Sequence, residues 1–238
     1  MTENSAPSFF DSTYQLMKHG PENPGEWQLC YARQTETLLA ALRPGMRLLD
    51  VGCGPSLPYA KPAGVELIGL EPSFQSLRHN AALDLKIAGS AYAIPLADAS
   101  IDVVVCFYAI HHMVGRTVAE NEANVRTAFA EFGRVLKPGG RLLVFEMTPG
   151  PLFGAAQALL WNTARRALGA KLDMHFFSRA ALERLGSASL PIGTALDAFS
   201  FDSSPLAPIS PIFSLPRLKV PRFVYPLGAR LYRWHLPT

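Results

Sequence analysis

Short apolar segments alternate with longer segments of helical periodicity through the middle of the chain. The apolar segments predict five strands, in "MRLLDVG", "VELIGLEP", "LKIAGSA", "IDVVVCFYAI" and "RLLVFEM", of which the first, second and fourth are expected to be buried. Apolar spacing predicts helices in "EWQLCYARQTETLLAALRPG", "SFQSLRHNAAL" and "NEANVRTAFAEFGRVLKPGG", the last ending at Pro138-Gly139-Gly140. Strand and helix alternate from residue 46 to residue 147. This order predicts an α/β fold with a doubly wound, mostly parallel sheet, whose ligand crevice lies at the carboxyl ends of the strands.

The two flanks have different patterns. Residues 1–25 are polar and interrupted by Pro and Gly. After the fifth strand, "LFGAAQALLWNTARRALG" and "SRAALERLG" have helical spacing. Residues 203–238 are rich in Pro, but they carry too many large apolar residues for a disordered tail. We therefore expect this extended Pro-rich segment to be ordered and packed against the rest of a single domain.

Composition narrows the class of protein. Of the 238 residues, 49% are hydrophobic, which is enough for a sizeable core, and the formal net charge is only +3. Lys and Arg are scattered, so the charge pattern argues against a nucleic-acid partner. The three cysteines are far apart and are expected to be free thiols of a reducing compartment. The N-terminus lacks the features of a signal peptide, and the longest uncharged run contains Pro and Gly. We expect a soluble cytoplasmic protein without stable membrane insertion, and weak association with a membrane surface stays open.

The segment "LLDVGCGPS" (residues 48–56) joins the first predicted strand to a glycine turn. Gly52 and Gly54 allow the backbone to approach a ligand closely. Glu71 ends the second predicted strand about 20 residues later, where an acid accepts hydrogen bonds from ribose hydroxyls. Leu57 stands where the third glycine of a dinucleotide fingerprint belongs, and no Gly-Lys-Ser/Thr follows for a P-loop. The pattern favours a ligand that carries a ribose but need not carry a pyrophosphate.

Four separated segments resemble one known family. "LLDVGCGPS", "GLEPS", "GSAYAIPLADASIDVVVCFYAIHHM" and "EFGRVLKPGGRLLVFE" are similar in order, spacing and wording to class I S-adenosylmethionine-dependent methyltransferases, particularly the small-molecule branch of quinone and natural-product enzymes. The resemblance covers roughly residues 35–150. It implies a Rossmann-like fold with S-adenosylmethionine as cofactor. It also implies an N-terminal helical cap segment (1–34), a cofactor-binding core (35–150) and a segment with acceptor-covering helices, last strands and Pro-rich tail (151–238).

The resemblance also implies a set of cofactor contacts at the ends of the strands. The expected residues are Asp50, Gly52, Cys53 and Gly54 beside the methionine moiety and ribose, Glu71 at the ribose hydroxyls, Pro72 or Ser73 beside the adenine ring, Ser90 and Ala91 at the adenine edge, and Cys106 and Phe107 at the methionine amino group. Relatives usually carry Asp where this chain has Ser90. A neutral hydroxyl makes a weaker contact than a charge-assisted one, which bears on cofactor affinity.

Candidates for the reaction itself follow the fourth predicted strand. His111 is a candidate base, whereas His112 is expected to be structural and Tyr108 either lines the pocket or packs. Methyl transfer depends mainly on positioning, and a base is needed only where the acceptor loses a proton. The candidate acceptor-binding residues are Tyr14, Trp27, Tyr31 and His175, each weighed against ordinary packing. Asp98 and Asp102 are expected to be structural, and no metal site is predicted.

The predicted function is methylation of a small, rather apolar or aromatic metabolite at oxygen, nitrogen or carbon. Two alternatives stay open at this point: a methyltransferase-fold protein that uses the bound sulfonium for another reaction such as a cyclisation, and a cofactor-binding protein without turnover. The helix predicted within residues 152–168 is interpreted as a cover over the acceptor pocket, with an amphipathic membrane contact as the alternative. The Pro-rich tail is long enough to form the interface of a homodimer.

Overall fold

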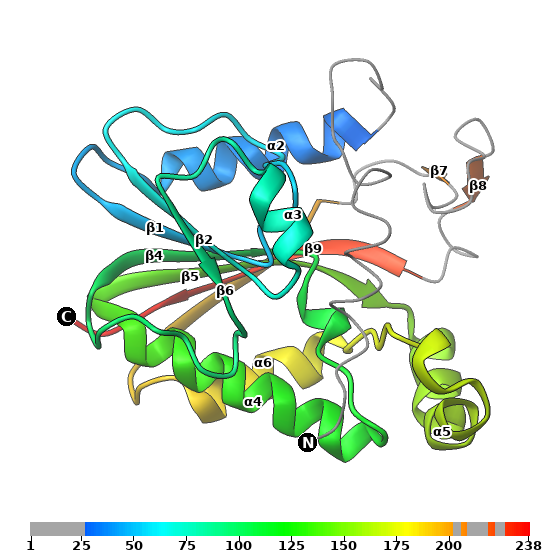
Figure 1. Cartoon of the computed structure of the whole chain (residues 1–238). Coiled ribbons are helices and arrows are strands. Elements are labelled where there is room, and N and C mark those ends of the chain that lie inside the picture. The colour runs from blue at the N-terminus through cyan, green and yellow to red at the C-terminus, as the bar shows by residue number, and fades with distance from the viewer. Residues whose placement is uncertain (1–26, 202–205, 209–218, 222–226) are drawn as a thin grey trace.

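A central seven-stranded sheet organises the chain, and the computed structural model describes residues 27–201, 206–208, 219–221 and 227–238 (Figure 1). The strand order is β3-β2-β1-β4-β5-β9-β6. The strands are β1 (Arg47–Val51), β2 (Glu66–Glu71), β3 (Leu85–Ala88), β4 (Ile101–Phe107), β5 (Leu136–Pro149), β6 (Ala195–Ser200) and β9 (Leu227–His235). The strands β1 to β5 pair in parallel, and β9 is antiparallel to both of its neighbours, β5 and β6. The predicted mostly parallel, doubly wound sheet is therefore confirmed.

The strand order reverses between β1 and β4. The chain moves outward from β1 to β2 and β3 and then returns to the other side of β1 with β4 and β5. At such a reversal the connections leave in opposite directions and open a crevice outside the carboxyl ends of the strands. The ends of β1, β2, β4 and β5 meet at this edge, which is where the ligand crevice was predicted.

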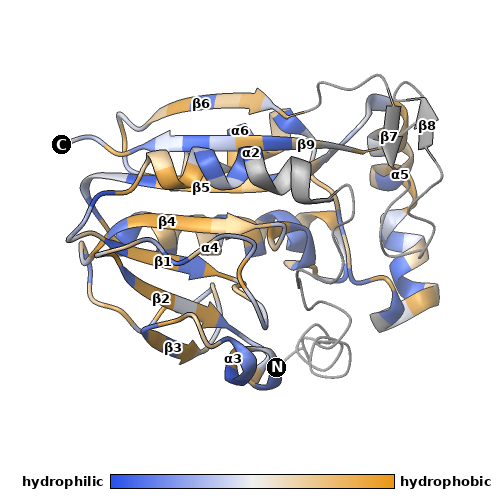
Figure 2. Ribbon diagram, turned by 90° about the horizontal axis from the view of Figure 1, so that it is seen from above, coloured by the Kyte–Doolittle hydropathy of each residue, from blue (hydrophilic) through white to orange (hydrophobic). Residues whose placement is uncertain are grey.

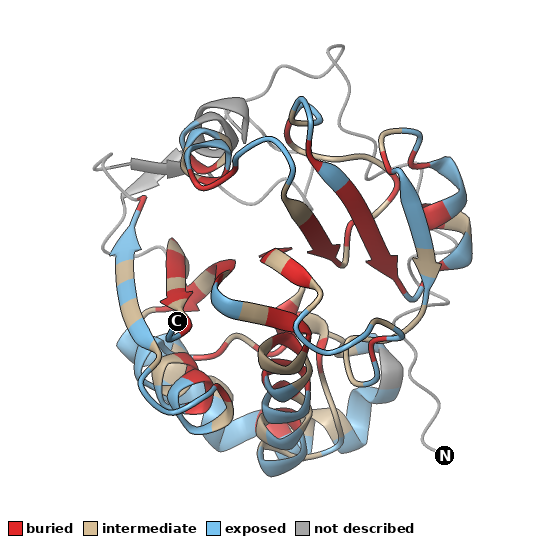
Figure 3. Cartoon of the chain, turned by 90° about the vertical axis from the view of Figure 1, so that its left-hand side faces the viewer, coloured by how far each residue is buried: buried red, intermediate tan, exposed pale blue. Residues whose placement is uncertain are grey.

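Helices cover both faces of the sheet (Figure 1). Side chains of α2 and α3 share one buried cluster with one face, and side chains of α4 and α6 share a second cluster with the other. Leu48 belongs to the first cluster and Leu49 to the second, because successive side chains of a strand point to opposite faces. Figure 2 shows the apolar central strands, and Figure 3 shows how far their residues are buried. The helices are α2 (Trp27–Ala40), α3 (Phe74–His79), α4 (Val118–Val135), α5 (Pro151–Leu168) and α6 (Arg179–Ser189), with 3-10 turns at η2 (Ile110–His112) and η3 (Gly169–Lys171).

Side-chain caps begin three of these helices. The Ser73 hydroxyl accepts a hydrogen bond from the amide of Ser76 at 3.1 Å, as the sequence predicted for α3. Thr117 caps α4 and Ser178 caps α6 in the same way. Each cap satisfies an amide that has no partner within the helix, which favours the helix beginning at that residue.

The boundary between α4 and β5 differs from the prediction. We expected the helix to end at Pro138-Gly139-Gly140, but α4 ends at Val135 and β5 begins at Leu136. The reason is a tertiary contact with the C-terminal segment: the Gly139 amide donates to the carbonyl of Pro237 at 2.8 Å, and the Leu236 amide donates to the carbonyl of Gly140 at 3.0 Å. These bonds draw the Pro-Gly-Gly turn into the sheet, where the pairing of β4 with β5 shifts register.

The end of the Pro-rich segment forms an inner strand of the sheet. Trp234 of β9 is fully buried, and Gly186 of α6 lies against it so closely that an added Cβ would stand 2.5 Å from the indole ring. The prediction of an ordered segment is therefore confirmed for β9. Two short paired strands, β7 (Leu206–Pro208) and β8 (Lys219–Pro221), precede it, and the rest of the predicted segment between residues 202 and 226 lies outside the described residues.

Candidate cofactor and acceptor site

The predicted glycine turn leaves β1 in a conformation that suits glycine. Gly52 has φ +72° and Gly54 has φ +58°, both in the left-handed region that other residues rarely adopt. A Cβ added at Gly52 would lie 2.7 Å from the Cβ of Ala109, in the loop after β4. The turn therefore approaches the end of β4 across the reversal point, and a larger residue at position 52 would force the two apart.

Glu71 connects the glycine turn to the end of β2. Its Oε2 accepts a hydrogen bond from the Gly54 amide at 3.0 Å, and its Oε1 accepts one from the Ser73 amide at 2.9 Å. The residue is only 5% exposed. A carboxylate offers about four lone-pair sites, enough to hold two backbone amides together with a ribose diol. The sequence predicted an acid near the turn, and the structure shows that these two backbone amides fix the orientation of its carboxylate.

Asn80 holds the same turn from the other side, and sequence analysis missed it. The side-chain amide of this buried residue donates to the carbonyl of Cys53 at 3.3 Å and to that of Gly54 at 3.0 Å. The Cys53 thiol is buried, and burial raises its pKa well above the usual value, so the thiol stays protonated. An Asn at the end of α3 has the ordinary sequence signature of a helix terminus, so nothing in the pattern marked it as a ligand-loop residue.

Asp50 and Tyr59 form a buried pair next to the turn. The Tyr59 hydroxyl donates to Oδ2 of Asp50 at 2.5 Å, and Asp50 is 1% exposed. Burial raises the pKa of Asp50 to about 7; the nearby Glu71 also raises it, whereas the bond from Tyr59 lowers it. The predicted Asp50 therefore lies at the site, but its carboxyl is enclosed with Tyr59, a residue that sequence analysis did not single out.

Tyr108 and α2 meet at the end of β4. Tyr108 has φ +52°, an unusual conformation for a residue with a side chain, and such strain is most often found at functional sites. Its hydroxyl accepts a hydrogen bond from the Gln34 side-chain amide at 2.5 Å. Gln34 is buried on α2, so this helix reaches over the region where the four strand ends meet. A polar Gln34 within a helical pattern is ordinary, so the sequence did not indicate that this residue reaches the site.

His111 is held by a buried glutamate. Glu146, fully buried near the end of β5, accepts from Nδ1 of His111 at 2.7 Å, from the His111 amide at 3.2 Å and from the Met147 amide at 2.7 Å. A carboxylate only accepts hydrogen bonds, so Nδ1 of His111 is the donor in this contact. In a neutral imidazole the lone pair is then on Nε2. This arrangement suits a base. Glu146 lay within the quoted "RLLVFE" segment but was not predicted as a site residue.

The two other predicted histidines lie beside His111. Nδ1 of His112 is 3.3 Å from the carbonyl oxygen of Asp173, and burial lowers its pKa well below the usual value, in agreement with the expected structural role. The His175 amide donates to the carbonyl of His111 at 2.8 Å, and burial lowers the pKa of His175 to about 4. The structure therefore brings His175, far along the chain, to the candidate base.

A small aromatic cluster surrounds His175. Its ring makes edge contacts with Trp161 at 4.7 Å and Phe177 at 4.8 Å between centroids, and Phe176 stacks on His111 at 5.2 Å. Among the described residues, neither His175 Nδ1 nor Trp161 Nε1 has a hydrogen-bond partner, although both atoms are buried. Buried polar atoms are normally satisfied, so this pair is a candidate for contact with a polar atom of a ligand.

The remaining predicted residues fall into three groups. Ser90 is half-buried and its hydroxyl accepts from the Tyr92 amide at 3.2 Å, while Ala91 is half-buried beside it and Pro72 is exposed next to Glu71. Cys106 pairs with strands on both sides, and Phe107 stacks on Phe145 at 4.3 Å. Tyr14 lies outside the described residues, and Trp27 and Tyr31 belong to α2 with side chains that are not described.

Asp98 and Asp102 occupy structural positions, as expected. Asp98 forms an ion pair with Arg134 at 2.6 Å. Asp102 accepts from the Arg47 amide at 2.8 Å and pairs with Lys137 at 2.8 Å; burial raises its pKa, but these contacts together outweigh burial and lower it.

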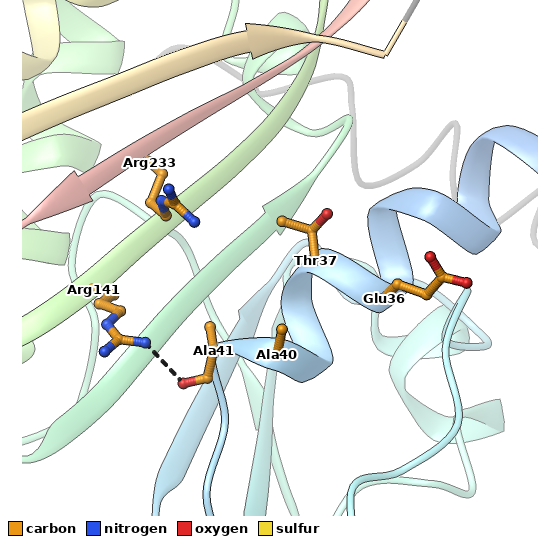
Figure 4. A pocket seen from close by; sticks show the side chains of 6 residues that line it. All are labelled: Glu36, Thr37, Ala40, Ala41, Arg141 and Arg233. Atoms are coloured by element: carbon orange, nitrogen blue, oxygen red, sulfur yellow. Dashed lines mark hydrogen bonds between the residues drawn. The ribbon is translucent and has the colours of Figure 1, made fainter.

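A hollow of about 340 Å³ lies elsewhere, between the end of α2 and the start of β5 (Figure 4). It is lined by Glu36, Thr37, Ala40, Ala41, Arg141 and Arg233. Arg141 donates to the carbonyl of Ala41 at 3.2 Å across it. Arg141 stands at the amino-end half of β5, so this hollow is on the opposite edge of the sheet from the glycine turn, and it holds none of the predicted site residues.

Two further features concern metals and membranes. No three His, Cys, Asp or Glu side chains of the described residues gather as a metal site. Within the same residues, no helix combines the length and the apolar character needed to cross a membrane.

The fold and the turn define the class of domain. Strand order 3-2-1-4-5 with an antiparallel strand inserted at the sixth position, a glycine turn after β1 and an acid ending β2 together define a Rossmann-like methyltransferase fold. Residues 49–144 match a methyltransferase domain family. The resemblance to class I S-adenosylmethionine-dependent methyltransferases found in the sequence is confirmed.

Known relatives agree over the same region. A demethylmenaquinone methyltransferase of Renibacterium salmoninarum is 37% identical over 134 residues, which is 53% of this chain and 52% of the relative. A 27-O-demethylrifamycin SV methyltransferase of Amycolatopsis mediterranei is 33% identical over 124 residues, 46% of this chain and 42% of the relative. The chain thus matches only about half the length of these relatives. The crystal structure of the 4+2 cyclase SpnF shares the fold with a TM-score of 0.65 and 18% identity, over 100% of this chain and 97% of that one.

Proposed function

We propose that the protein is a methyltransferase that uses S-adenosylmethionine and acts on a small, rather apolar or aromatic metabolite. The observation that carries this proposal is the Glu71 carboxylate, which bonds the Gly54 amide at the carboxyl ends of β1 and β2. An acid in this position, beside a turn that excludes a Cβ at Gly52, fits a nucleoside with a ribose diol. Similarity to methyltransferases of small molecules supports the reaction type.

The residues present fit this cofactor. The Glu71 carboxylate would hold the ribose hydroxyls, and the backbone of Gly52 and Gly54 would lie along the methionine side. Ser90 and Ala91 would meet the adenine edge, with Pro72 beside the ring. When bound, the sulfonium supplies an activated methyl group, so the protein's main task is to place the acceptor in line and to exclude water.

We further propose that His111 is the base where the acceptor loses a proton. Glu146 keeps the imidazole proton on Nδ1, so Nε2 receives the proton from an acceptor hydroxyl, amine or acidic C–H. Tyr108, with its strained backbone and its bond to Gln34, would line the same acceptor site. His175 and Trp161 would bond a polar atom of the acceptor, because their buried ring nitrogens lie next to this region.

The partners of the reaction follow from the same features. The acceptor is a small molecule rather than a nucleic acid, since basic residues are scattered along the sequence. The cytoplasmic location, the role in biosynthesis and the homodimer stay predictions. Tyr14, Trp27 and Tyr31 remain proposed contacts from the cap segment.

Two carboxylates on the same strand allow a matched test. Glu71→Gln is expected to weaken binding of S-adenosylmethionine, measured by calorimetry, by at least about tenfold, because charge-assisted bonds to the diol are lost. Glu66→Gln at the other end of β2, where the side chain pairs with Arg47 in solvent, is expected to leave affinity unchanged. If the wild-type protein does not bind S-adenosylmethionine or its demethylated product, the proposal is wrong. Mass spectrometry of products then separates methyl transfer, which adds one methylene, from a cyclisation.

A further inference from the structure

The helix α5 exposes most of its apolar side chains. Trp161 is its buried residue, whereas Leu152 is 89% exposed, Leu159 81% and Leu160 58%. A helix that belongs to the core of a domain normally turns such residues inward. The outward face here consists of Leu152, Ala155, Ala156, Leu159, Thr163 and Arg166, which follow one another at helical spacing.

The charged side chains of this chain segment have one sign. From Met147 to Leu172 the chain contains no Asp or Glu, but it contains Arg165, Arg166 and Lys171 at the end of the helix. Arg165 is occupied, because its guanidinium donates to the carbonyls of Gly115 and Leu172. Arg166 and Lys171 are exposed and add positive charge at the end of the apolar face. This combination is typical of helices that lie in the plane of an anionic membrane surface.

The position of α5 relates this face to the candidate site. Figures 1 and 2 both show α5 at the end of the molecule toward which the parallel strands point. The buried side of the helix contacts the site, because Trp161 lies against His175 and the His175 amide is bonded to His111. The exposed face therefore lies on the outside of the same helix that borders the proposed acceptor site.

We propose that the outward face of α5 docks on an anionic lipid bilayer, so that the acceptor is an apolar molecule dissolved in that bilayer. The proposal that α5 docks depends only on the exposure and charge of its side chains, whereas the proposed acceptor also depends on the proposed function. The helix lies in the interface with Leu152 and Leu159 among the acyl chains, and Arg166 and Lys171 contact the head groups. An acceptor leaving the bilayer then meets the aromatic cluster around His175 first.

Vesicle flotation with the full chain tests the docking. Binding is expected to vesicles of phosphatidylcholine with phosphatidylglycerol, and to be much weaker with phosphatidylcholine alone or at high salt. The double substitution Leu152→Asn with Leu159→Asn is expected to lower the partition coefficient by roughly tenfold or more for each leucine. Arg166→Gln is expected to lower it roughly fivefold on the anionic vesicles only. The matched control is Ile192→Asn, because Ile192 is an exposed apolar residue in the loop between α6 and β6, and this variant should bind like the wild type.

If something other than a bilayer covers the outward face of α5, these experiments give different results, and each of those results overturns the proposal. If a second copy covers the face, the wild type does not bind vesicles, and the double substitution changes its sedimentation from dimer to monomer. If part of the same chain covers it, vesicle binding is absent and the double substitution lowers the free energy of unfolding. Cofactor affinity is measured on the same samples, so a failure of the proposed function, with no binding of S-adenosylmethionine, is distinguished from a failure of docking.

Discussion

The side-chain amide of Asn80 lies 3.0 Å from the carbonyl oxygen of Gly54, so the end of α3 is tied directly to the glycine turn. Glu71 bonds the amide of the same glycine, and the turn is thus held through both its donor and its acceptor. Because the turn contains residues with positive φ, its conformation depends on these two side chains as well as on glycine.

Removing the Asn80 amide is expected to loosen the turn. Asn80→Ala should lower the free energy of unfolding by about 1–3 kcal/mol, because the carbonyls of Cys53 and Gly54 lose their donor, and should weaken cofactor binding as well. Asn124→Ala is the control, since Asn124 makes one long bond of 3.5 Å to the Met113 carbonyl on a helix away from the turn. Urea denaturation and calorimetry measure the two effects. Equal results for both variants would contradict the role given to Asn80.

The proposed base is tested by comparing the two neighbouring histidines. His111→Gln should lower kcat by roughly 10²–10⁴-fold for an acceptor that must lose a proton. His112→Gln should lower it by less than about tenfold, because that ring bonds a backbone carbonyl. Glu146→Gln should also lower kcat, since the imidazole loses the carboxylate that holds its Nδ1. Equal losses of kcat in His111→Gln and His112→Gln would contradict the role given to His111.

Asp50 makes stability fall as the pH rises. Its pKa is raised to about 7 in the folded state, whereas an unfolded Asp titrates near 4. Between these values the folded state keeps a proton that the unfolded state loses, so the free energy of unfolding decreases with increasing pH and the penalty is complete above about pH 7. Asp50→Asn removes the titration, and its stability should decline less than that of the wild type between pH 5 and pH 8. Asp102→Asn serves as the control. The pKa of Asp102 is lowered in the folded state, so its titration affects stability only below this pH window.

Two helical glycines are expected to respond in opposite ways to alanine. In Gly186→Ala the new Cβ would stand 2.5 Å from the Trp234 ring, so the substitution should destabilise the protein by about 1–3 kcal/mol. In Gly154→Ala the nearest contact is 3.5 Å, to Pro149, and the gain in helix propensity should stabilise by up to about 1 kcal/mol. Thermal unfolding measures both. A stable Gly186→Ala variant would mean that α6 moves away from the sheet at little cost.

Much of the fold was predictable because its signals are local. Continuous apolar runs marked β1 to β5, and helical spacing marked α2 to α6, since burial on a sheet or on one helix face leaves a short-range pattern. The end of α4 was not predictable from such a pattern. The Pro138-Gly139-Gly140 turn is a normal helix stop, but hydrogen bonds from Leu236 and to Pro237 bring it into the sheet.

The site divides in the same way. The sequence by itself determined the glycine turn, the acid at Glu71 and the histidines after β4, because strand ends in a parallel sheet converge wherever their neighbours lie in the chain. Only the tertiary structure decided that Glu146 orients His111, that Asn80 holds the turn and that His175 reaches the site. These contacts join residues 26 to 64 positions apart, and no periodicity encodes which of many polar side chains will meet after folding. The tertiary structure also decides which face of α5 is exposed, because apolar spacing indicates a helix but not which of its faces the domain covers.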